Sequence, residues 1–229
     1  MAYQSTDVYR YLIYLEKYLL GDLELFHQNA KIAEDFERKI QNRSKNKGCS
    51  NFFIRKTSSA NLIQTTKYPY SFEFMFGAAV IPRSTIPNTA TLFATIDVLG
   101  YLTRTGTDYT DTSKNFKEFF DYPSSFIDQA ELTVLIKVYR HGLTHNYFPK
   151  LKMEISYHSS NPTNKLFFKN SIGDLVLNVN RLEILVLNRL REIINTESLF
   201  PNMDSQHSYM IQEYENQCRS SITNLLAIL

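Results

Sequence analysis

This chain of 229 residues contains only two cysteines and no tryptophan. The cysteines, Cys49 and Cys218, stand far apart and form no metal-ligand spacing. Two scattered thiols argue against a disulfide scaffold and are typical of a protein kept in a reducing compartment. We therefore expect a cytoplasmic protein.

Long apolar runs and a strong charge of one sign are also lacking. No stretch approaches the roughly 18 apolar residues of a membrane span, and the first residues lack the basic and apolar blocks of a signal peptide. The formal net charge of +2 is too small to indicate a nucleic-acid-binding protein by composition alone. These absences favour a soluble globular protein with no membrane partner, and any electrostatic signal for a partner must be local.

Apolar residues recur at spacings of three or four over much of the chain, which is the period of a helix that buries one face. Such helices are expected over 6–45, 89–101, 128–146 and 182–194, with others around 113–121 and from 204 or 205 to about 227. Prolines and Ser/Thr clusters exclude long helices from 49–88 and make that segment irregular. We expect a single, mainly α domain over 1–229.

A small amount of β structure is expected after the helix at 128–146. Residues 152–157 alternate between apolar and polar, Asn161-Pro162 favours a turn, and 165–169 can form the returning strand. The sequence thus predicts a β-hairpin inserted at 151–170 into a helical bundle.

The most distinctive segment lies near the end of the helix at 128–146 and reads Arg140-His141-Gly142-Leu143-Thr144-His145. No acidic residue occurs between Glu131 and Glu154. Four cations therefore have no nearby carboxylate in the sequence: Lys137, Arg140, Lys150 and Lys152. A guanidinium group recognises phosphate oxygens bidentately, and imidazole exchanges protons near neutral pH. This combination suits phosphate chemistry.

Arg140 and His145 do not share a face of a straight α-helix, because five residues correspond to about 140° of rotation. Gly142 weakens the helix and Pro149 ends it, so a distortion near His145 is expected. His141 and His145, four residues apart, do share a face.

The segment resembles the HEPN superfamily of helical domains, many of which are metal-independent ribonucleases. The family signature is an arginine, four to six residues and a histidine, often with a polar residue after the arginine. Arg140, His141 and His145 match it, and the wider pattern of Ile96–Gly100 and Val138–Lys150 is similar to that of uncharacterised bacterial members.

The resemblance implies a function for each of these residues. Arg140 would hold the scissile phosphate of RNA, His145 would transfer the proton, and His141 would position either group. Lys137, Lys150 and Lys152 would contact the RNA. It also implies a homodimer in which two motifs meet, 2′,3′-cyclic phosphate products, no cofactor, and a toxin or defence role with an antitoxin as partner.

Other interpretations stay open at this point. The protein can be a catalytically inactive HEPN-like module that binds nucleotide or RNA or mediates dimerisation. His141 and His145, with His158, can also be ligands of a metal, although the glutamate of the zinc-protease motif is missing. The basic run from Arg38 to Lys56 can follow an RNA backbone or simply be a solvated helix end. Asp97 can join the site or accept a buried hydrogen bond.

Overall fold

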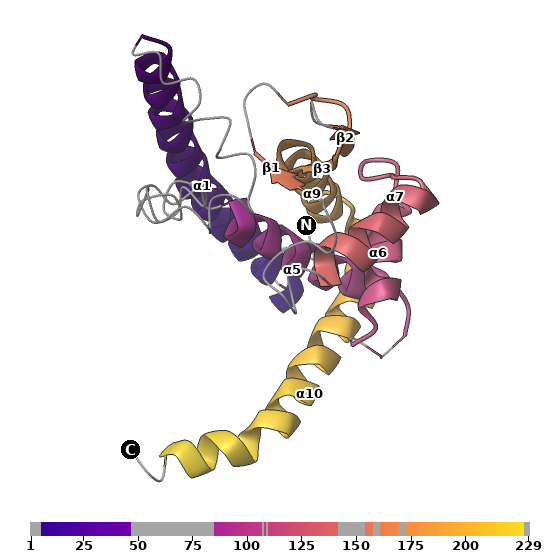
Figure 1. The fold of residues 1–229 in the computed structure, drawn as a ribbon. Coiled ribbons are helices and arrows are strands. Elements are labelled where there is room, and N and C mark those ends of the chain that lie inside the picture. Colours follow the sequence, from indigo (N-terminus) through magenta and orange to yellow (C-terminus); the bar gives the residue numbers. More distant parts are fainter. Residues whose placement is uncertain are drawn as a thin grey trace.

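The computed structural model describes residues 6–46, 85–106, 108, 110–141, 154–157, 161–169 and 173–226, with side chains of the first helix described up to residue 32. The described chain is mainly helical with a small three-stranded sheet (Figure 1). Its elements are α1 (Asp7–Asn46), α5 (Thr85–Thr103), α6 (Thr112–Phe120), α7 (Gln129–Val134), the π-helix η2 (Leu135–Arg140), β1 (Glu154–Ser156), β2 (Phe167–Lys169), β3 (Leu175–Asn178), α9 (Val179–Ile194), the 3-10 helix η3 (Glu197–Leu199) and α10 (Phe200–Leu226).

Helix α5 is the centre of the described fold, because it contacts α1, α6, α9 and α10. Its apolar residues Leu92, Ile96 and Leu99 are completely buried, as the sequence predicts. Threonines are accommodated within it because their hydroxyls donate to backbone carbonyls of the preceding turn, as from Thr95 to Thr91. The helix begins at Thr85, so 85–88 of the segment expected to be irregular are helical, while 49–84 lie outside the described residues.

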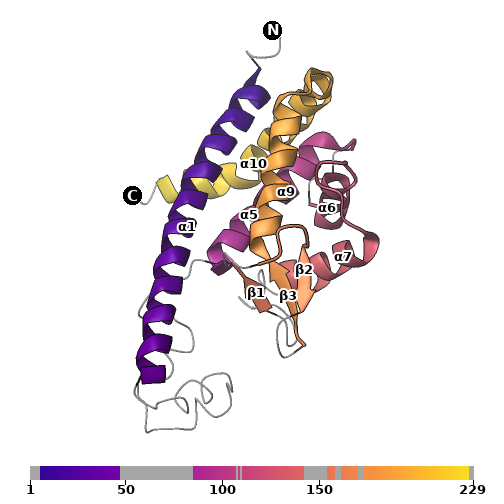
Figure 2. The same ribbon diagram turned by 90° about the horizontal axis from the view of Figure 1, so that it is seen from above.

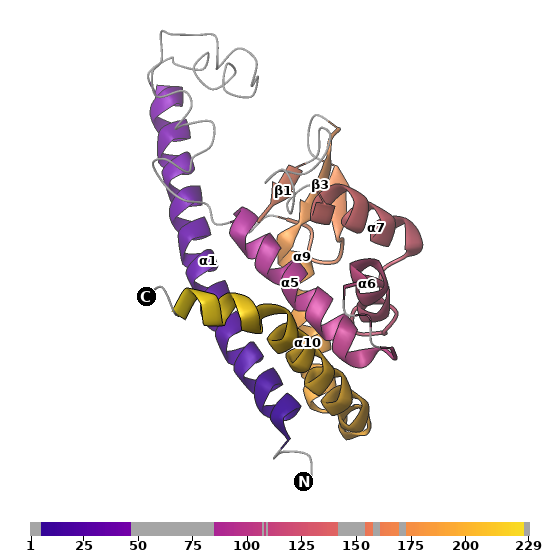
Figure 3. The same ribbon diagram turned by 90° about the horizontal axis from the view of Figure 1, so that it is seen from below.

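Helix α1 runs without interruption through Gly21 along one side of α5 and α9 (Figure 3). The start of α10 packs against its N-terminal part, where Tyr9 meets Phe200 and Tyr11 meets His207. The face of α1 that packs on the core consists of the buried residues Val8, Leu12, Leu19 and Leu23. Ile32 belongs to the predicted apolar period, but its side chain is 53% exposed. Within the described residues, no helix combines the length and the apolar character needed to cross a bilayer.

The predicted hairpin is wrong in its pairing. Strands form at 154–156 and 167–169, but both pair with β3, in the order β1-β3-β2 (Figure 2). β1 runs parallel to β3, and β2 runs antiparallel to it. The reason is the short apolar run Leu175–Leu177, which is largely buried and takes the central place. The turn is fixed by Asn178, whose amide donates to the carbonyls of Pro162 and Lys165 at 2.6 and 2.8 Å.

The helix that leads to the motif begins with a capping box. Asp128 accepts a hydrogen bond from the backbone of Glu131, and the Glu131 carboxylate accepts one from the backbone of Asp128. After one α-helical turn and a half, the backbone changes to a π-helix over 135–140, with Leu135 and Tyr139 buried. A π-helical distortion thus precedes the motif, whereas the distortion expected near His145 lies outside the described residues. Gly142, which was expected to cause it, lies outside the described residues.

Candidate functional site around Arg140

The Arg140 side chain is fixed by a residue from another helix. Its Nη2 donates to Oγ1 of Thr112, the first residue of α6, at 2.9 Å. The Thr112 hydroxyl donates in turn to Oδ2 of Asp97 on α5 at 3.4 Å. Thr112 therefore forms a bridge between the guanidinium group and a carboxylate. We call Asp97, Thr112 and Arg140 the Arg140 relay.

A fourth side chain fixes the carboxylate end of the relay. Nδ2 of Asn115 donates to Oδ1 of Asp97 at 2.8 Å, and Asn115 is almost completely buried. Thr112 and Asn115 are three residues apart on α6, so both face the same side of that helix. Asp97, which the sequence left between a role in the site and a buried hydrogen bond, accepts hydrogen bonds from both residues.

Burial raises the pKa of Asp97 above its ordinary value. The hydrogen bond from Asn115, the charge of Arg140, the hydrogen bond from Thr112 and the charge of Arg104 act in the opposite direction. Arg104 is itself buried just after α5, with its guanidinium carbon 5.6 Å from the centre of the Tyr101 ring. Two arginines thus act on one half-buried carboxylate.

Three of the predicted site residues are described. Arg140 and His141 are half-buried at the end of η2, and Lys137 is exposed three residues before Arg140. His145, Lys150 and Lys152 lie outside the described residues, as do the side chains of the basic run from Arg38 to Lys56. The structure thus brings Arg140 together with Asp97, Thr112 and Asn115, while its distance to His145 stays a prediction.

Thr112 was missed by reasoning from the sequence. It stands 28 residues before Arg140, and the only local signal at this point is Asp111, which caps α6 by accepting from the backbone of Lys114. That signal locates the start of a helix but gives no reason to pair its first residue with Arg140. The contact follows from how α6 packs against α5.

A second polar cluster joins α1, α5 and α9. Glu183 of α9 is buried, and its Oε2 lies 2.9 Å from Nε2 of His27 while its Oε1 accepts from Asn88 Nδ2 at 2.5 Å. The His27 ring stacks on Tyr157, with ring centres 5.1 Å apart. Burial raises the pKa of Glu183, against the hydrogen bonds from Asn88 and His27 and the charge of His27. We call this set the Glu183 cluster.

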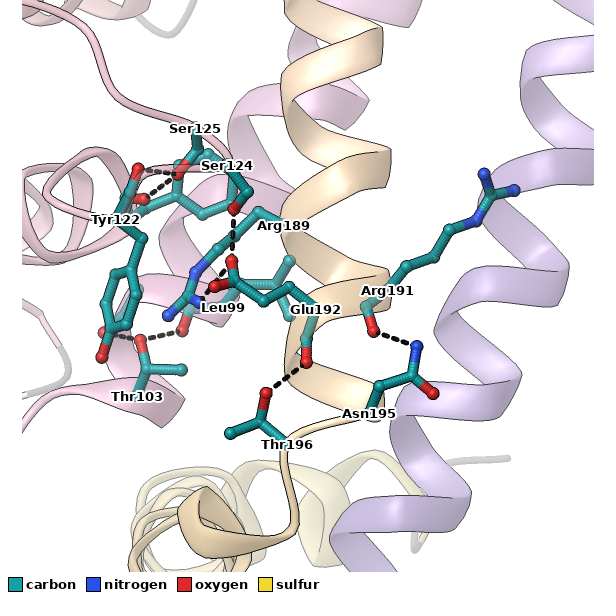
Figure 4. Close-up of polar contacts among 12 residues, drawn as sticks. Leu99, Thr103, Tyr122, Ser124, Ser125, Arg189, Arg191, Glu192, Asn195 and Thr196 are labelled. Carbon is teal, nitrogen blue, oxygen red and sulfur yellow. Dashed lines mark hydrogen bonds and ion pairs between the residues drawn. The ribbon is translucent and has the colours of Figure 1, made fainter.

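A third cluster surrounds Arg189, whose side chain reaches from α9 toward the segment after α6 (Figure 4). The guanidinium carbon lies 3.2 Å from the centre of the Tyr122 ring, and Nη1 pairs with Glu192 at 3.0 Å. Glu192 also accepts a hydrogen bond from Ser124. The Arg189 side chain is 1% exposed, whereas that of Glu192 is 35% exposed. This cluster holds α9 against the end of α6.

No described part of the chain has the donor set of a metal site, since no group of three or more His, Cys, Asp or Glu side chains comes together there. The metal alternative involving His141 is not tested, because His145 and His158 lie outside the described residues. No family model, curated protein or solved structure matches this chain. Its function therefore has to be argued from the residues themselves.

Proposed function

We propose that this protein is a metal-independent endoribonuclease of the HEPN-like type. The observation that carries the proposal is the Arg140 relay, which fixes the guanidinium group of the last residue of a π-helix, directly before His141 in the sequence. π-helical turns are frequent at functional sites. A fixed guanidinium group can bind phosphate oxygens with little further loss of side-chain freedom.

Arg140 would bind the non-bridging oxygens of the scissile phosphate and stabilise the charge that develops on them. His145 would accept the proton of the RNA 2′-hydroxyl, which attacks phosphorus, or give a proton to the leaving 5′-oxygen. The new O2′–P bond replaces the P–O5′ bond, so the products are a 2′,3′-cyclic phosphate and a 5′-hydroxyl end. His141 would orient the phosphate or the acting imidazole.

The remaining parts of the proposal concern partners. Lys137, exposed one turn before Arg140, would contact the RNA backbone together with Lys150 and Lys152. By resemblance to the family, two copies would bring their motifs together, so that one His145 acts as the base and the other as the acid. A toxin or defence role with an antitoxin partner belongs to the same proposal.

A specific observation favours the alternative of a binding module without catalysis. Arg140 already donates a hydrogen bond to Thr112 and is attracted by Asp97, and both contacts compete with a phosphate for the guanidinium group. In that case the protein would bind RNA or nucleotide through its cations but would not break the phosphodiester bond.

The test is cleavage of a mixed RNA pool in the presence of EDTA, followed by analysis of the ends formed. The variants are Arg140→Ala and His145→Ala, with Arg10→Ala as the control, because Arg10 is an arginine of α1 whose side chain is 63% exposed. Cyclic-phosphate ends from the wild type and the control alone would support the proposal. Equal cleavage by all four proteins would contradict it. Binding without cleavage, weakened in Arg140→Ala, would support the alternative.

A further inference from the structure

An apolar stripe on α1 faces away from the core of the described fold. Tyr14, Tyr18, Leu25 and Ile32 are 57, 69, 59 and 53% exposed. Their spacings of four, seven and seven residues keep them within about 40° of rotation on an α-helix. They lie on a different face from Val8, Leu12, Leu19 and Leu23, which are buried. We call these four exposed residues the α1 stripe.

The stripe has the spacing of a helix that packs against another helix. Tyr18, Leu25 and Ile32 repeat every seven residues, and Tyr14 and Gly21 occupy the intermediate positions, as in the apolar seam of a coiled coil. The Tyr14 and Tyr18 rings lie against each other, with centres 6.4 Å apart. In the described structure the rings make no other aromatic contact, and their hydroxyls make no hydrogen bond. The remaining intermediate position, between Leu25 and Ile32, is occupied by the polar residue Gln28.

Gly21 gives an independent indication that another backbone approaches here. A glycine within a helix lowers its stability by about 0.5–1 kcal/mol relative to alanine. Intramolecular packing does not require it, because a Cβ at this position would meet nothing within 4 Å. A glycine in the middle of the stripe does, however, allow a second helix to come close.

We propose that a second copy of this chain covers the α1 stripe, with the two α1 helices packed antiparallel across Gly21. A two-fold interface needs one patch that is complementary to itself, and the stripe has this property. At on the order of 200 Å² for each full side chain, its four members expose roughly 500 Å². That is close to the apolar share of a standard interface, which buries about 800 Å² of each partner, a little over half of it apolar.

The charges on one flank of the stripe complement an antiparallel second helix. Lys17 and Glu24 are exposed and lie seven residues apart on one flank of the stripe. An antiparallel partner places its Glu24 opposite Lys17 and its Lys17 opposite Glu24, so that opposite charges meet twice along this flank.

This interface is separate from the Arg140 site and does not rest on the proposed function. Figures 1 and 3 show α1 on one side of α5 and α9, with α7 and the π-helix on the other. The α1 interface leaves the two Arg140 residues apart. A chain that also joined its motifs would form a larger assembly, in which breaking the α1 contact halves the molar mass.

The first test is sedimentation equilibrium of the whole chain at micromolar concentrations. Tyr18→Glu is expected to halve the molar mass and raise the dissociation constant at least about thirtyfold. Phe126→Glu is the matched control, since Phe126 is a 65% exposed aromatic residue outside α1. Gly21→Ala favours the helix, yet it is expected to weaken the dimer at least about tenfold, because a methyl group blocks the close approach.

Cross-linking tests the orientation. In a chain with Cys49 and Cys218 replaced by serine, Lys17→Cys and Glu24→Cys are made as separate variants. Oxidation is expected to link the two chains when the variants are mixed and to link neither variant to itself. A monomeric wild type, a dimer that persists in Tyr18→Glu, or links between two Lys17→Cys chains would each overturn the proposal. The loss of RNA cleavage in Arg140→Ala has no bearing on these results.

Discussion

A Cβ on Gly100 of α5 would lie 1.9 Å from the carbonyl oxygen of Asn115 on α6. The two helix backbones are thus in direct contact, and only glycine fits between them. Asp97 stands one turn before Gly100, and it accepts the 2.8 Å hydrogen bond from Asn115. The close approach at Gly100 therefore places α6 where Thr112 can reach both Asp97 and Arg140.

Gly100→Ala is expected to destabilise the protein by about 3 kcal/mol or more, because the obstacle is a backbone carbonyl and not a side chain that can move. The measurement is the free energy of unfolding in urea. Ala94→Gly on the exposed face of the same helix is the control and should cost only about 0.5–1 kcal/mol. A variant at Gly100 as stable as this control would show that α5 and α6 are not in contact there.

The relay gives a prediction that rests on the proposed ribonuclease. Thr112→Val removes the hydroxyl between Arg140 and Asp97, so kcat and kcat/KM for RNA cleavage should both fall on the order of tenfold while KM changes little. Thr112→Ser keeps the hydroxyl and should restore most of the rate. If the serine variant were as impaired as the valine variant, the hydroxyl would not be the group that matters.

The sequence predicted the helices well because their apolar periods are long. The faces that contain Leu12 and Ile96 are buried as expected. The starts of α5 and α10 were predicted a few residues too late. Both helices begin before a proline, with Pro87 and Pro201 in their first turns. Proline is tolerated there because the first backbone N–H groups of a helix have no partner within it.

The sheet and the relay could not be predicted, because both depend on contacts between distant segments. Leu175–Leu177 is a short apolar run without alternation, and nothing in it indicates the central strand. Thr112 likewise meets Arg140 only after α5, α6 and η2 have packed. The motif itself supplied Arg140 as a candidate, but not the residues that fix it.

The Glu183 cluster predicts a dependence of stability on pH. Burial raises the pKa of Glu183 in the folded state. Its contribution to the free energy of unfolding is therefore greatest at low pH and is lost as the pH rises through this folded-state pKa. Glu183→Gln cannot ionise, so the stability of the wild type relative to this variant should fall between acidic and neutral pH. Urea unfolding of both proteins at several pH values measures this difference in the free energy of unfolding.

The control for this prediction is Glu16→Gln. Glu16 also joins α1 to α9, through a 3.0 Å pair with Arg191 in which the arginine side chain is 53% exposed. The Glu16 side chain is 24% exposed, against 8% for that of Glu183. A constant difference in stability between the wild type and Glu183→Gln over the whole pH range would contradict the assignment.

The Arg189 cluster predicts an asymmetry between two partners of one ion pair. Arg189 is 1% exposed, so Glu192→Ala leaves a buried guanidinium group without its carboxylate and should cost about 3 kcal/mol of unfolding free energy. Arg189→Met keeps the apolar packing against Tyr122, and the Glu192 carboxylate that it leaves is 35% exposed and can be hydrated. Arg189→Met should therefore cost less unfolding free energy than Glu192→Ala.

The double variant should lose less stability than the two single losses together, since the charge left behind by each single change is absent. Urea unfolding of the four proteins closes this cycle, and a larger loss for Arg189→Met than for Glu192→Ala would mean that the cluster acts through the Tyr122 contact and not through the ion pair.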